Sequence, residues 1–175
     1  MATMANEMFL LIGAAYGLGA VLLLAAALHD VAARTIPNWV PLCLLALGIL
    51  LRFLDASLIA GLSLGLFVFA VAVFCWKRHW LGGGDVKLIS AAAVFVPSAH
   101  VGDLLVAVTL CGGAVGLIYL LGRLLSKGQR HAASARPRGR MARILRVERR
   151  RLSRGGPLPY ASAIAAGTIF IILAG

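Results

Sequence analysis

Two aspartates are notable because each lies at the edge of an apolar stretch. Asp30 ends the first apolar run, in the segment ALHDVAARTIPN, and Asp85 opens a later run, in LGGGDVKL. Acids at membrane depth are energetically expensive and are more often functional than incidental. When two carboxyl groups share a site, one stays protonated near neutral pH, and the pair can act as general base and general acid on a water molecule. That is the chemistry of aspartic proteolysis.

The other four of the six acids have simpler explanations. Glu7 and Glu148 lie in polar flanks, and Asp55 and Asp103 fall in short turns between apolar runs, where aspartate is a common turn residue. We therefore assign candidate chemistry to Asp30 and Asp85 alone.

Three glycines, Gly82, Gly83 and Gly84, precede Asp85 directly. Glycine can adopt positive φ and lets a second backbone approach closely. We expect this loop to admit an extended substrate strand beside Asp85, although an ordinary flexible turn would have the same composition.

The composition predicts an all-α, polytopic membrane protein with a single domain over residues 1–175. The chain has 175 residues, of which 61% are hydrophobic and 13% charged, and its mean hydropathy is +0.95. Soluble domains are about 45–50% apolar and about 25% charged. A bilayer core is spanned by about 20 apolar residues. We predict six spans, at about 8–28, 38–54, 58–76, 86–99, 101–122 and 158–174.

The fourth predicted span, 86–99, has only 14 residues, but the distribution of charge favours counting it as a crossing. With six crossings, sixteen of the seventeen Lys and Arg residues fall on one side, and only Arg52 on the other. By the positive-inside rule the shared side is cytoplasmic and both termini are outside. Two spans separate Asp30 from Asp85, so both acids lie at the cytoplasmic boundary.

A basic loop at about 126–156 holds eleven of the Lys and Arg residues, between Lys127 and Arg154. Because this loop adjoins membrane spans, we expect it to be a topology anchor in contact with anionic lipid and not a nucleic-acid site. The three cysteines lie inside apolar runs with no paired spacing, so we expect neither disulfides nor a metal site.

Two segments carry a resemblance to a known family. DVAARTIPN, from Asp30 to Asn38, and GGGDVKL, from Gly82 to Leu88, resemble the signature segments of the type IV prepilin peptidases, bacterial inner-membrane aspartic proteases of the GxGD class. A third stretch, PLPYASAIAAG, contains Pro159 and Tyr160 and is similar to the family's final span.

The resemblance implies a specific activity. Asp30 and Asp85 match the family's catalytic pair, which activates water, without metal or cofactor, to remove the basic leader of a prepilin at the cytoplasmic face. Larger members also carry paired CxxC cysteines and N-methylate the new terminus. This chain lacks those cysteines. We therefore expect a peptidase without methyltransferase activity, similar to the small members that serve tight-adherence (Flp-type) pili.

Three further residues are candidates to support the site, and each also has a simpler structural explanation. Arg34 would share a helical face with Asp30 and favour its ionised form, or would serve only as a positive-inside anchor. Asn38 would position substrate or start the next helix. Lys87 would contact substrate or, as we favour, extend to the lipid headgroups.

Three other functions remain open from the sequence. A presenilin-like intramembrane protease shares the GxGD pattern. A small transporter or channel would use Asp30 and Asp85 as a proton or cation site, and would need a polar path across the bilayer. A catalytically silent scaffold would be held at the membrane by the basic loop. The sequence gives no expectation for the oligomeric state.

Overall fold

The computed structural model describes residues 2–126 and 160–174, and this part of the chain is helical throughout apart from short connections. The predicted basic loop and Pro159 lie outside the described residues. The α-helices are α1 (Ala2–Ala33), α2 (Trp39–Leu54), α3 (Leu58–Lys77), α4 (Gly83–Phe95), α5 (Val101–Ser126) and α7 (Tyr160–Ala174), with a short 3-10 helix, η1 (Ser98–His100), before α5.

The prediction of an all-α membrane protein is confirmed. Three segments are long and apolar enough to cross a bilayer, Asn6–Ala33, Leu58–Lys77 and Ser98–Gly122, and they correspond to the first, third and fifth predicted spans. No more than 22% of the most apolar window of each is buried inside the protein. Because so much apolar surface stays exposed, these helices need lipid around them. The second and sixth predicted spans form shorter apolar helices, α2 and α7.

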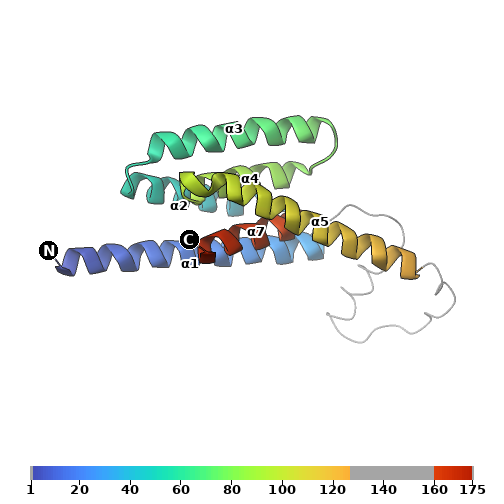
Figure 1. The fold of residues 1–175 in the computed structure, drawn as a ribbon, viewed down its shortest axis with the longest axis horizontal. Helices are drawn as coiled ribbons and strands as arrows, with labels where there is room; N and C mark the ends of the chain where they lie inside the picture. Colours follow the sequence, from blue (N-terminus) through green and yellow to red (C-terminus); the bar gives the residue numbers. More distant parts are fainter. Residues whose placement is uncertain (1, 127–159, 175) are drawn as a thin grey trace.

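Helix α4, the doubtful fourth span, is the centre of the bundle. Its 13 residues pack against α2, α3 and α7. Successive α-helices run in alternating directions along the molecule (Figure 1). From Val86 to Phe95 almost every apolar side chain of α4 is buried. A helix that is enclosed by other helices has little contact with lipid, so its length need not match the thickness of the hydrocarbon core. This explains why α4 is shorter than an ordinary span.

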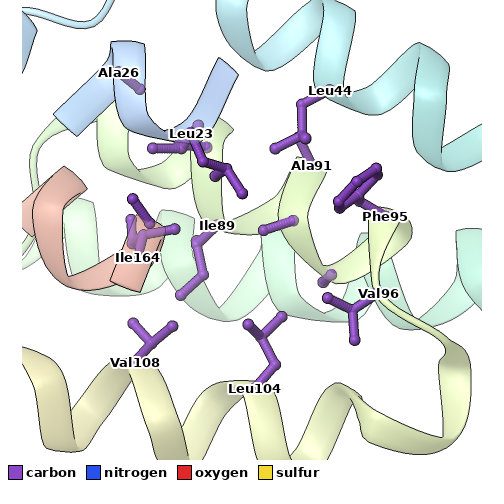
Figure 2. Close-up of a cluster of buried hydrophobic side chains, with 14 of the residues drawn as sticks. Leu23, Ala26, Leu44, Ile89, Ala91, Phe95, Val96, Leu104, Val108 and Ile164 are labelled. Carbon is purple, nitrogen blue, oxygen red and sulfur yellow. The ribbon is translucent and has the colours of Figure 1, made fainter. Parts of the chain in front are cut away.

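The core around α4 draws on five helices. Leu23 from α1, Leu44 from α2, and Leu104 from α5 point at α4 side chains, as does Ile164 from α7 (Figure 2). Phe95, which is fully buried, packs edge-on against the Tyr16 ring with 5.4 Å between ring centroids. This packing fixes the axial position of α4, and therefore of Asp85 in its first turn, relative to the end of α1.

Candidate active site

Asp30 lies in the last turn of α1 and is only 7% exposed. Its Oδ2 accepts a hydrogen bond of 3.3 Å from the backbone N–H of Ala161, the second residue of α7. The first N–H groups of a helix lack intrahelical partners and carry partial positive charge, so they stabilise an anion. The hydrogen bond therefore joins the end of α1 to the start of α7.

Asp85 is partly buried in the first turn of α4. Its Oδ2 accepts a 3.2 Å hydrogen bond from the N–H of Gly82, the residue that caps the helix. A helix-capping contact of this kind holds the carboxyl group close to its own backbone.

The three glycines do not use the positive φ that is open to this residue type. Gly82 is extended, with φ −75° and ψ 148°, and Gly83 and Gly84 begin α4 without left-handed backbone. The physical reason for glycine is lack of space. A Cβ on Gly82 would lie 2.9 Å from Oδ2 of Asp85, and one on Gly84 would lie 3.1 Å from Cβ of Ile36. Gly84 thus lets Ile36, in the segment after α1, pack directly against the start of α4.

The two aspartates line one pocket of about 290 Å³ at the end of the bundle where α1 ends and α4 begins. Eight of the ten residues predicted for the site line this pocket, and Thr35 and Ile36 complete it. The eight are Asp30, Arg34, Asn38, Gly82, Gly83, Gly84, Asp85 and Lys87. Within the described residues, no three His, Cys, Asp or Glu side chains are grouped so that they could hold a metal ion.

Asp85 precedes the predicted span at 86–99, and its environment differs from that of Asp30. Burial raises the pKa of the Asp85 carboxyl group to about 6, and the negative charge of Asp30 acts in the same direction. The Gly82 N–H and the Arg34 charge lower it by less. The Asp85 carboxyl group therefore retains its proton into the mildly acidic range.

Arg34 does not continue the helix that carries Asp30, contrary to the helical spacing expected from the sequence. Helix α1 ends at Ala33, and Arg34 has a positive φ of 57° while its N–H donates to the Asp30 carbonyl at 2.8 Å. Its guanidinium donates to the Tyr119 hydroxyl at 2.9 Å and lies 5.8 Å from the centre of the Tyr119 ring. Sequence reasoning missed Tyr119, although a tyrosine in an apolar span signals a hydroxyl that needs a partner.

Lys87 and Asn38 bind each other. The Lys87 ammonium donates to Oδ1 of Asn38 at 2.8 Å, so it reaches across the pocket instead of extending only toward headgroups. Asn38 stands at the N-cap of α2, but its side chain makes no capping hydrogen bond.

Tyr160 does not line the pocket. It is the first residue of α7 and precedes Ala161, whose N–H binds Asp30. Its ring packs against Gly112, where a Cβ would lie 2.9 Å from Cε2 of Tyr160. The ring packs α7 against α5.

Comparison with known proteins agrees with the site. The family model of the type IV leader peptidases matches residues 17–121, a range that includes Asp30, Asp85 and the pocket-lining segment between Arg34 and Asn38. A search of curated proteins and a search of solved structures each return no significant match. Because the family model covers more than half of the 175 residues, the chain belongs to the type IV leader peptidase family.

Proposed function

We propose that the protein is a membrane aspartic endopeptidase that removes the leader of a prepilin or pilin-like protein. The observation that carries this proposal is that Asp30 and Asp85 line one pocket, where the negative charge of Asp30 acts on the Asp85 carboxyl group. We assign Asp85, whose carboxyl pKa is raised to about 6, as the acid, and Asp30 as the base.

The reaction follows from these two roles. A water between the carboxyl groups attacks the peptide carbonyl carbon while Asp30 takes one of its protons and Asp85 protonates the carbonyl oxygen. The resulting gem-diol collapses as the leaving nitrogen takes the proton from Asp30 and Asp85 recovers its proton from a hydroxyl. The leader leaves as a carboxylic acid, the mature protein keeps a free amine, and both aspartates return to their starting states.

Family membership and charge support the rest of the proposal. The leader of the substrate is short and basic, and it is cut at the cytoplasmic face of the bacterial inner membrane. The cysteines Cys43, Cys75 and Cys111 lie on three different helices as free thiols, with no CxxC pair, so methyl transfer is not part of the proposed activity.

A transport function is less consistent with the interior of the bundle. Among the described residues, the buried polar side chains are Asp30, Arg52 and Thr168. Arg52 pairs with Asp55 at 2.5 Å, and the Thr168 hydroxyl donates to the Ile164 carbonyl at 2.6 Å. Because Arg52 and Thr168 each bind a residue three or four positions away in sequence, the buried polar groups of the described residues do not line up as a polar path across the membrane.

The decisive experiment is to co-express the protein with a candidate prepilin and to follow leader removal by gel shift. We expect Asp30→Asn and Asp85→Asn each to slow processing by about 10²–10⁴-fold, the usual contribution of a general acid or base. Asp103→Asn is the matched control, because Asp103 pairs with His100 at 3.2 Å at the start of α5 and is exposed. Full processing by both pocket variants would show the aspartic mechanism to be wrong.

A further inference from the structure

A second cavity, of about 520 Å³, lies between α2 and α3 with α4 as its floor. Helices α2 and α3 each pack extensively along α4 but contact each other much less. The space left between them is a groove. We call it the α2–α3 groove; its walls include Leu42 and Leu45 on α2 and Leu66 and Phe69 on α3, and its floor includes Ser90 and Ala91.

The α2–α3 groove is apolar and open at the side. Leu42 is 64% exposed and Leu66 is 68% exposed, so the walls are accessible from the surrounding lipid. The Ser90 hydroxyl donates to the Val86 carbonyl of its own helix at 2.7 Å, so it requires no polar ligand. Small residues on a helix surface let a second helix approach closely within a membrane. These features suit an apolar helix.

The α2–α3 groove is continuous with the candidate active site. Asn38 and Lys87 line both the groove and the pocket that holds the two aspartates. From Lys87 the floor continues along α4 to Val94, a distance of about 10 Å at 1.5 Å per residue, or two helical turns. A chain whose scissile bond lies between the aspartates can therefore continue into the groove without leaving the protein.

We propose that the α2–α3 groove seats the first two helical turns of an apolar substrate segment, the one that directly follows the scissile bond. This inference rests on the proposed peptidase function. The basic leader is too polar for the groove and stays in the aqueous pocket and beyond it. The retained part of the substrate enters sideways from the bilayer, and its backbone passes the hydrogen-bonded pair Asn38 and Lys87 at the junction.

Two substrates separate binding in the groove from chemistry. One is a full prepilin in lipid vesicles, and the other is a short peptide that ends two residues after the scissile bond. Leu42→Trp and Leu66→Trp narrow the groove. We expect each to raise KM for the full substrate about tenfold with kcat unchanged, because binding common to ground and transition states is lost. Neither variant should alter kcat/KM for the short peptide.

Phe67→Trp is the matched control. Phe67 is adjacent to Leu66 on α3 and 63% exposed, but it does not line the groove. We expect this variant to process both substrates as the wild type does. If Leu66→Trp affects both substrates equally, or affects neither, the groove proposal is wrong while the peptidase function stands. If the wild-type protein cleaves neither substrate, the proposed function itself fails.

Photo-crosslinking identifies the occupant directly. A benzophenone side chain at position 42 or 66, in the Asp85→Asn background, should crosslink to the apolar segment of the full prepilin. The same group at position 67 should crosslink mainly to lipid. Crosslinking of positions 42 and 66 to lipid alone, in the presence of saturating substrate, would contradict the proposal.

Discussion

At the scale of single residues, the proposed mechanism gives different roles to two chemically identical side chains. Asp30 is buried and accepts a hydrogen bond from the N-terminus of α7. Asp85 lies nearer to solvent, and both burial and the charge of Asp30 raise the pKa of its carboxyl group. The difference depends on α7, which lies outside the residues matched by the family model.

The pH dependence of leader removal should therefore report on Asp85. As the acid, Asp85 must carry a proton, so the rate should fall as pH rises through its pKa of about 6. The positive charge of Arg34 lowers that pKa, so Arg34→Gln should raise it and move the alkaline limb to higher pH. The measurement is the rate of leader removal between roughly pH 5 and pH 9 in vesicles.

Arg78→Gln is the control for that shift. Arg78 follows α3 and its guanidinium lies 5.1 Å from the centre of the Phe74 ring, away from the pocket residues. Arg78→Gln removes one positive charge from the protein, as Arg34→Gln does, but it leaves the charge of the pocket residues unchanged. An alkaline limb that moves equally in both variants, or moves to lower pH in Arg34→Gln, would contradict the assignment of Asp85 as the acid.

At the scale of helices, the position of α4 depends on close contact with α2. A Cβ on Gly48 would lie 2.8 Å from the backbone nitrogen of Phe95 and 2.9 Å from its Cα, and this backbone cannot move like a flexible side chain. We expect Gly48→Ala to destabilise the protein by about 1–3 kcal/mol, the usual range for overpacking. The same displacement of α4 should slow leader removal, because α4 carries Asp85.

Gly17→Ala provides the comparison, because a Cβ there meets nothing within 4 Å. Gly17 is also inside an apolar helix, and the change should be neutral or stabilising by up to about 1 kcal/mol through helix propensity. Thermal unfolding in detergent, followed by tryptophan fluorescence, distinguishes the two variants. Equal Tm values would show that the α2–α4 contact does not limit stability.

Much of this helix arrangement was predictable from the sequence, because apolar length determines where spans occur. The spans at 58–76 and 101–122 agree with α3 and α5 to within a few residues at most boundaries. The central place of α4 was not predictable, since its composition is that of any weak span. Tyr119 and the Ala161 N–H were also missed, because both reach the site through packing between distant segments.

At the scale of the whole molecule, the chain carries its polar chemistry at the two ends of an apolar bundle. One end holds the pocket with Asp30 and Asp85. The other holds a structural cluster in which buried Arg52 pairs with Asp55 and donates to the Tyr16 hydroxyl at 3.3 Å. The Arg52 side chain crosses α3 at Gly61, and a Cβ on Gly61 would lie 2.6 Å from Cγ of Arg52. This cluster joins α1, α2 and α3 at the end away from the pocket.

The orientation of these two ends in the membrane can be tested with a matched pair of turn residues. Ala56 and His79 flank α3 at its two ends, both are exposed, and both have positive φ, 55° and 60°. Helix α3 has 20 residues, so it separates them by about 30 Å, the thickness of the hydrocarbon core. Lys77 and Arg78 next to His79 predict that this end is cytoplasmic.

Single cysteines at the two positions, in a background where Cys43, Cys75 and Cys111 are replaced by alanine, give opposite expectations. A membrane-impermeant maleimide added to spheroplasts should label Ala56→Cys at once, but His79→Cys only after the membrane is permeabilised. Equal labelling of an unfolded sample controls for thiol reactivity at the two turns. Labelling of His79→Cys in intact spheroplasts would place the aspartate pocket on the outer face, where a cytoplasmic leader could not reach it.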